Sequence, residues 1–388
     1  MRSFPAAVVT LAFLTTTSPA ASETTLDYSA GYGHSSNIFE DPQVLSGPFW
    51  EGKLGLRGSL ELGEGKLSYG IRQFERRITD FRFADTHLTG GTLGYSLPLG
   101  KGLLVEIEAA AVRNDSGDLF LKLPNNIIGY RTVDYSTQTA AKVTAEGFGG
   151  KTAFSAKYDE RRRGIAEFTT DLIRPTKLDP DVALATFGIS HFRPVAGGEL
   201  CLCVEYNRSI IPGNEQDSFT RFPATTLRGS LAYARRFDVG LTLIGEAGMI
   251  TLMSDDLGST SRYTEPYLRA EARWETSGGF EIGSGFRQDI VIDDIDDAVA
   301  ELTRTVSASV AQRFNPWVKA SLGYEVSRAS YYYYLYERKT ETVTAKLLLG
   351  PEKKPQLEIE YAHALQRETD PTQDYSANTI VARIGGSF

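Results

Sequence analysis

Long segments in which every second side chain is apolar recur from residue 24 to the end of this chain. In one of them, the side chains that alternate are Leu268, Ala270, Ala272 and Trp274 with Arg269, Glu271, Arg273 and Glu275. A period of two is that of a β-strand whose two faces meet different surroundings. Charges at every second position would be very costly against lipid but are natural against water. The pattern therefore predicts many strands, each with one apolar and one water-facing side.

The connections between these strands alternate between short turns and longer polar loops. Tight turns rich in Gly, Asn and Asp, which hairpin turns favour, are predicted at 63–66, 99–102, 147–150, 195–199, 237–240, 276–279, 314–317 and 350–356. Longer connections are predicted at 36–49, 80–87, 114–131, 163–181, 209–222, 254–262, 292–299, 329–339 and 368–374. Eight turns and nine loops make seventeen connections and hence eighteen strands. An even number places both termini at one end, as in bacterial single-chain barrels.

The two ends of the chain indicate export. Met1-Arg2 precedes an apolar run over 6–14 and small residues up to Ser22, which is typical of a secretory signal. The run is too short for a membrane-spanning helix. At the other end, Ile380, Ala382, Ile384, Gly386 and Phe388 share one face of a final strand. This ending resembles the terminal signal of bacterial outer-membrane barrels, in which a final Phe is read by the assembly machinery.

Together these features predict an all-β protein, a transmembrane antiparallel up-and-down β-barrel of about eighteen strands. We expect a signal peptide over 1–22 and a single barrel over 23–388, because composition stays uniform with no Pro/Ser-rich linker. The expected location is the bacterial outer membrane, with both termini periplasmic and the long loops outside. Expected partners are membrane lipid, lipopolysaccharide and the barrel-assembly machinery. A net charge of −8 argues against a nucleic-acid partner.

The only two cysteines, Cys201 and Cys203, fall on one face of a predicted strand. Adjacent same-face residues of a strand lie about 6.5–7 Å apart, at the outer limit for a disulfide. The sequence leaves open whether they are oxidised. A bridge is the less favoured state, and a metal site lacks supporting His or Cys ligands.

Function is expected to depend on the water-facing side of the strands. The predicted pore-lining residues are Arg57, Arg72, Arg76, Lys142, Arg228, Glu246, Arg269, Glu271, Arg273, Arg287, Asp289, Glu325, Glu358 and Glu360. The two signs are nearly balanced, so counting predicts no strong ion selectivity. Segregated charges would create a transverse field that orients solutes. Paired charges would instead form cross-strand bridges that stabilise the wall.

Motifs of catalysis are missing from the sequence. None of the four His has metal-ligand spacing with another, and there is no P-loop, nucleophile elbow or dinucleotide fingerprint. We therefore expect no enzyme, no cofactor and no metal site. The acidic stretch Asp293–Asp297 is interpreted as a solvated loop. The run Tyr331–Tyr334 is interpreted as part of an aromatic girdle, with sugar stacking as the alternative.

The first predicted strand, Leu26-Asp-Tyr-Ser-Ala-Gly-Tyr-Gly-His-Ser-Ser-Asn-Ile-Phe39, resembles the opening strand of the "beta-barrel porin 2" family of outer-membrane proteins. Those strands typically read aromatic-Gly-Tyr-Asp-Ser/Asp-Asn-Ile/Val-Phe, and here Gly33-His34 replaces the usual Asp. The resemblance implies a hydrophilic passage for exporting exopolysaccharide or oligosaccharide. A general or solute-selective diffusion porin is the first alternative, and a closed structural or adhesive barrel is the second.

Overall fold

We describe a computed structural model of the chain. It covers residues 23–100, 102–124, 126–219, 221–254, 261–292, 300–332, 335–351 and 354–388. The expected signal peptide, the acidic stretch at 293–297 and the tyrosines at 333 and 334 lie outside these ranges. None of the helices in the described ranges has the length and apolar character needed to cross a membrane.

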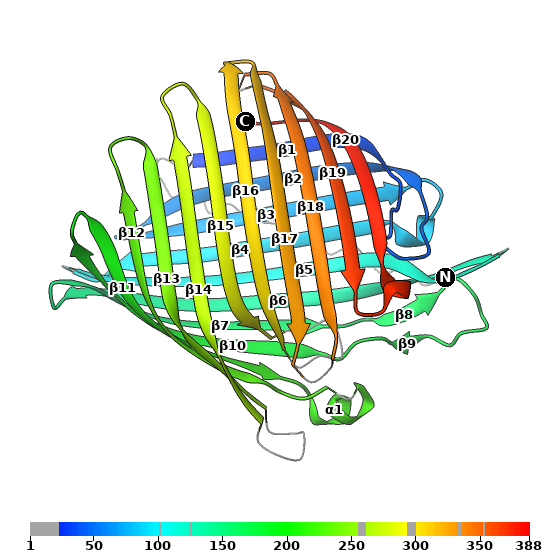
Figure 1. The fold of residues 1–388 in the computed structure, drawn as a ribbon, viewed down its shortest axis with the longest axis horizontal. Helices are drawn as coiled ribbons and strands as arrows, with labels where there is room; N and C mark the ends of the chain where they lie inside the picture. Colours follow the sequence, from blue (N-terminus) through cyan, green and yellow to red (C-terminus); the bar gives the residue numbers. More distant parts are fainter. Residues whose placement is uncertain are drawn as a thin grey trace.

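The chain forms a single sheet that closes on itself (Figure 1). The strands are β1 (Glu23–Ser35), β2 (Gly47–Leu62), β3 (Gly65–Ile78), β4 (Thr86–Pro98), β5 (Leu103–Leu123), β6 (Asn126–Gly147), β7 (Gly150–Arg162), β8 (Ile165–Phe168), β9 (Thr176–Lys177), β10 (Val182–Val195), β11 (Gly198–Ile210), β12 (Thr225–Arg236), β13 (Leu241–Ser254), β14 (Ser261–Glu275), β15 (Phe280–Val291), β16 (Glu301–Asn315), β17 (Val318–Tyr331), β18 (Glu337–Leu349), β19 (Gln356–Glu368) and β20 (Tyr375–Ser387). A short helix, α1 (Gly213–Phe219), and two 3₁₀ turns, η1 (Arg82–Ala84) and η2 (Pro371–Gln373), lie in the connections.

Each wall strand pairs antiparallel with the next, and β20 pairs with β1. Of the twenty strands in the sheet, β8 and β9 form a small hairpin beside β6, and the other eighteen make the closed wall. In Figure 1 the strands of the near wall, β12 to β20, cross those of the far wall at a wide angle. The predicted up-and-down barrel of eighteen strands is therefore confirmed.

The predicted short turns lie where the structure has its tight connections, but the predicted loops over 114–131 and 163–181 contain strands. Instead of a loop over 114–131, β5 and β6 continue as a hairpin that pairs as far as Leu123 and Asn126. The strands β8 and β9 add to this extension, with Tyr130 opposite Phe168. The polar residues Asn114, Asp115 and Ser116 suggested a loop, but they lie in a strand that projects past the rim.

The two faces of the wall differ as alternation requires. Large apolar side chains such as Ile71, Ile107 and Leu202 are 55%, 55% and 60% exposed on one face. The charged side chains of the same strands occupy the alternate positions, where they pair with charges on neighbouring strands of the inner face. Because large apolar side chains predominate on the outer face away from the rim, it is suited to contact lipid acyl chains.

Two apolar clusters close parts of the rim that carries the long loops. One joins Phe49 and Val381 of the wall to Ile38, Phe39, Phe81 and Phe83 of the first two loops. The other joins Ile250, Leu252 and Tyr267 to Phe222 and Ile292 on the connections after β11 and β15. These loops therefore pack against the wall at the rim.

The barrel interior as the candidate functional site

Across the closure of the barrel runs one row of inward positions. Register places Glu358 of β19, Arg383 of β20, Gly31 of β1, Glu51 of β2 and Arg76 of β3 side by side. Arg383 bonds Glu358 at 2.7 Å, and it also contacts Glu51 on the far side of β1. Since Glu51 is 9% exposed, this contact is largely withdrawn from water. The closure is therefore bridged from inside by charge-assisted hydrogen bonds.

These bridges depend on two glycines of β1 that lie between the partners. A Cβ atom on Gly31 would lie 2.8 Å from Cγ of Arg383 and 2.9 Å from the carbonyl oxygen of Ala382. A Cβ atom on Gly33 would overlap the ring of Phe49, which packs in the same cluster as Val381 of β20. Strand β1 therefore lacks side chains where those of β2 and β20 meet over it.

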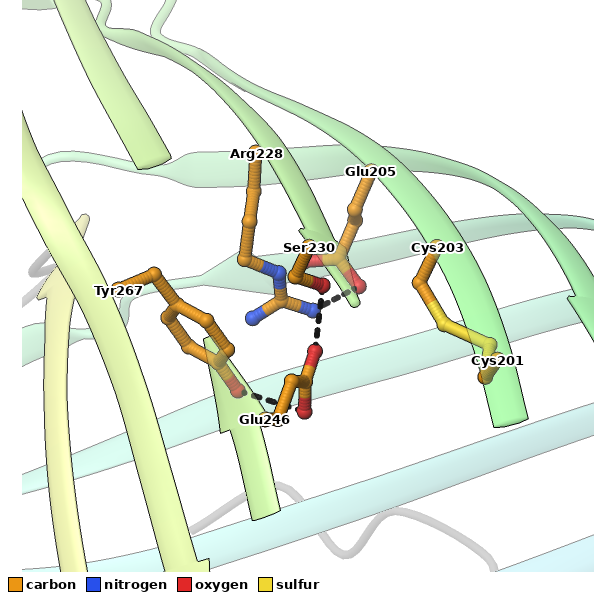
Figure 2. The surroundings of a disulfide bond; sticks show 7 residues. All are labelled: Cys201, Cys203, Glu205, Arg228, Ser230, Glu246 and Tyr267. Atoms are coloured by element: carbon orange, nitrogen blue, oxygen red, sulfur yellow. Dashed lines mark hydrogen bonds and ion pairs between the residues drawn. A yellow bond between two sulfur atoms is a disulfide. The ribbon is translucent and has the colours of Figure 1, made fainter. Parts of the chain in front are cut away.

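A second cluster lies on β11 to β15 (Figure 2). Arg228 bonds Glu205 at 3.0 Å, lies 3.8 Å from Asp289, and stacks over the Tyr267 ring at 4.4 Å. Glu246 accepts hydrogen bonds from the hydroxyls of Ser230 at 2.5 Å and Tyr267 at 3.3 Å. The side chains converge from four neighbouring strands, as Figure 2 shows. The cluster is a fixed polar patch on the wall.

The two cysteines lie beside this patch and are joined as a disulfide, with a Cα–Cα distance of 5.9 Å (Figure 2). Two free thiols are the state that the sequence favours, so the disulfide differs from that expectation. The spacing within β11 is shorter than the regular same-face repeat of about 6.5–7 Å, which brings the pair within disulfide range. Cys201 is 5% exposed, whereas its neighbour Leu202 is 60% exposed on the outer face.

The other predicted residues occupy the same interior face. Their ion pairs are Arg57 with Asp27 at 3.2 Å, Lys142 with Glu106 at 3.4 Å, Arg269 with Glu271 at 2.7 Å, Arg273 with Glu281 at 3.4 Å, Arg287 with Asp289 at 2.6 Å, Arg76 with Glu51 at 3.9 Å, and Arg383 with Glu360 at 2.6 Å. The sequence left open whether these charges are segregated or paired, and in the structure most of them are paired.

Arg72 and Glu325 are the exceptions among the predicted set, since neither forms a hydrogen bond or ion pair with another residue of the described ranges. Arg72 lines a recess of about 670 Å³ on the inner side of the far wall. Small residues such as Gly55, Gly70 and Gly90 make the floor of this recess, with Asp159 at its side. The recess therefore offers an exposed guanidinium above a smooth wall.

The alternation of the sequence did not single out Glu51, Gly31 or Tyr267. Glu51 stands next to Trp50 at the expected end of a loop, and its partner Arg383 is 332 residues away. Glu51 and Arg383 come together only because β1 pairs with β2 on one side and with β20 on the other. Knowing the closure register would have identified this row from the sequence.

No family model matches the chain, and no curated protein matches it in sequence. Among solved structures, OccAB3 of Acinetobacter baumannii is 12% identical over 95% of this chain and 99% of that one, with a TM-score of 0.51. The outer membrane protein opdK of Pseudomonas aeruginosa is 10% identical over 94% and 99%, with a TM-score of 0.51. The ferric enterobactin receptor PfeA of the same species is 10% identical over 94% and 80%, with a TM-score of 0.53. The chain has the fold of bacterial outer-membrane barrels.

Proposed function

We propose that the barrel is an outer-membrane passage for small hydrophilic solutes, lined by the charged inner wall. The observation that carries the proposal is the interior itself, with charged or small polar residues at the inward positions and an apolar outer face. Water-facing charge on the inside of a barrel of this size suits an aqueous channel. We place the short turns and both ends of the barrel on the periplasmic side, as in bacterial barrels.

The wall favours small solutes over sugar chains. Packing on pyranose rings requires exposed aromatic faces, but Phe49 and Tyr267 are 0% and 3% exposed. Each is also covered by a guanidinium, from Arg76 at 4.1 Å and Arg228 at 4.4 Å. Tyr331, the first residue of the tyrosine run, is only 8% exposed. Exopolysaccharide export, which the first-strand resemblance implies, is therefore the second candidate, and no catalysis is proposed.

Single-channel conductance in planar bilayers tests the proposal. The purified barrel should conduct, and Arg72→Glu should shift the reversal potential in a salt gradient toward cation selectivity. This change removes a cation that has no partner in the described wall, so it breaks no ion pair. Arg77→Glu is the control, because Arg77 lies on the outer face with Glu75.

A barrel without conductance would contradict the proposal and favour the closed adhesive barrel. Current that is blocked by purified exopolysaccharide at low concentration, but not by small charged solutes, would favour export. Equal shifts from Arg72→Glu and Arg77→Glu would show that the recess has no special role. A genomic neighbourhood of glycosyltransferases rather than catabolic enzymes would separately support export.

A further inference from the structure

A row of four cationic side chains crosses the outer surface of the barrel near the long-loop rim. Register places Arg304 of β16 opposite Arg328 of β17, Arg328 opposite Lys339 of β18, and Lys339 opposite Arg367 of β19. All four residues are exposed. The four strands lie side by side on the near wall in Figure 1. The row shares its face with Val306 and Tyr324, which are 51% and 44% exposed.

This arrangement is electrostatically unfavourable in the isolated barrel. Like charges directly opposite on neighbouring strands have Cβ atoms about 4.5–5.5 Å apart and are destabilising. Two carboxylates offset part of the charge, Glu337 at 2.5 Å from Arg328 and Glu341 at 2.6 Å from Lys339. Two positive charges of the row are therefore left without a carboxylate of their own.

The ends of the row carry this excess. Arg304 donates to the neutral amide oxygen of Gln288 at 2.8 Å. Arg367 forms no hydrogen bond or ion pair with any residue of the described ranges. A guanidinium that is exposed, held in a strand and not hydrogen-bonded to a carboxylate is well placed to bind a phosphate through two parallel hydrogen bonds.

Three other outward cations near the same rim are arranged differently. Arg77 bonds Glu75 at 2.5 Å, Arg113 bonds Asp115 at 3.1 Å and Arg162 bonds Glu160 at 2.7 Å. In each case the carboxylate lies two residues along the same strand, and no other cation stands opposite. The four-residue row is thus a local concentration of charge rather than a uniform belt.

We propose that this row binds the phosphate groups of lipopolysaccharide, with the acyl chains on the wall below. The exposed apolar side chains two and more residues along the same strands provide the surface for acyl chains, and the cations stand where headgroups begin. With the long loops outside, this rim meets the leaflet that contains the phosphorylated glycolipid. Bound phosphate supplies the negative charge that the row lacks.

The test compares two double variants of the whole folded barrel in detergent. Arg304→Gln with Arg367→Gln removes the two cations without a carboxylate, so no acidic residue is left unpaired. Arg77→Gln with Arg113→Gln is the matched control at the same rim. Binding of fluorescent lipid A is measured for each, and heat-modifiable gel mobility confirms that each variant is folded. The row variant should bind roughly thirty-fold more weakly, since each cation near an anionic lipid surface contributes about one kcal/mol.

Two further probes separate phosphate recognition from general lipid binding. Dephosphorylated lipid A should bind the unaltered barrel as weakly as phosphorylated lipid A binds the row variant. Phosphatidylglycerol dispersed in the same detergent should bind more weakly than lipid A, because one molecule brings a single diester charge, which cannot neutralise the row. Equal losses in the control variant, no loss in the row variant, or equal binding of phosphatidylglycerol would each overturn the proposal. If the row variant fails to fold, Arg367→Gln alone gives the same comparison with about half the effect on free energy.

Discussion

Gly33 lies at the closure of the barrel, where the space beside β1 is too small for a Cβ atom. A Cβ atom there would lie 2.8 Å from the carbonyl oxygen of Ile380 and would overlap the Phe49 ring. Because Phe49 is fully buried and the oxygen belongs to the backbone, neither can move cheaply. We expect Gly33→Ala to destabilise the folded barrel by about 1–3 kcal/mol, measured as a lower urea midpoint in refolding experiments. Gly52→Ala is the control, since the nearest atom to its Cβ is 3.9 Å away; an equal loss there would contradict the argument.

The disulfide is a residue-scale feature with a small energetic effect. It closes a loop with only one intervening residue, and the stabilisation expected from so short a loop is about 2 kcal/mol or less. We expect Cys201→Ser with Cys203→Ser to fold and to insert as well as the unaltered chain. Urea unfolding with and without reductant measures this. A barrel that no longer assembles would show that the bond has a larger structural role.

At the scale of one element, β14 gives the clearest test of which face meets water. Leu268 and Trp274 are 37% and 41% exposed on the apolar face, whereas Arg269 bonds Glu271 on the other. The thiol of Arg269→Cys should react with a water-soluble reagent, and that of Ala270→Cys should not. Ala270→Arg should lower the amount of assembled barrel, because a cation on the lipid face at the midplane costs roughly 2–4 kcal/mol. The reverse labelling pattern would invert the assignment of every inward residue.

Elements also show why part of the structure could be predicted from the sequence and part could not. The alternation of Leu268 to Glu275 reports the local period of a strand, which depends only on neighbours along the chain. The β5–β6 extension has polar residues such as Asn114 and Asp115 because it projects beyond the apolar wall, so alternation no longer separates strand from loop. The partnership of Arg383 with Glu51 depends on the closure register, which joins the two ends of the chain. The period of the sequence carries no information about which residues at the two ends of the chain face each other.

For the whole molecule, Phe388 is predicted to matter for assembly more than for stability. The side chain is 74% exposed and stacks on Tyr28 with ring centroids 5.4 Å apart. Deleting the residue removes this exposed stacking and its two backbone hydrogen bonds to Leu26, both at the end of the sheet, so refolded truncated barrel should keep a urea midpoint close to that of the full chain. Its level in the outer membrane should fall severalfold if the residue is read during insertion. Heat-modifiable mobility of membrane fractions measures that level, and normal levels of the truncated chain would refute the role.

The position of Arg383 has a consequence for the order in which the chain is completed. Its carboxylate partners lie on β2 and β19, and the arginine itself is on β20, which follows both of them in the chain. Within the described ranges, Arg383 is the ion-pair partner of Glu358. Before β20 arrives, an unfinished barrel therefore carries an acidic side chain without its cation on one edge. Arrival of β20 and neutralisation of that edge are one event, and the same guanidinium then reaches Glu51 of β2 across β1, so the strand that covers the acidic edge also carries the cation that bridges the closure.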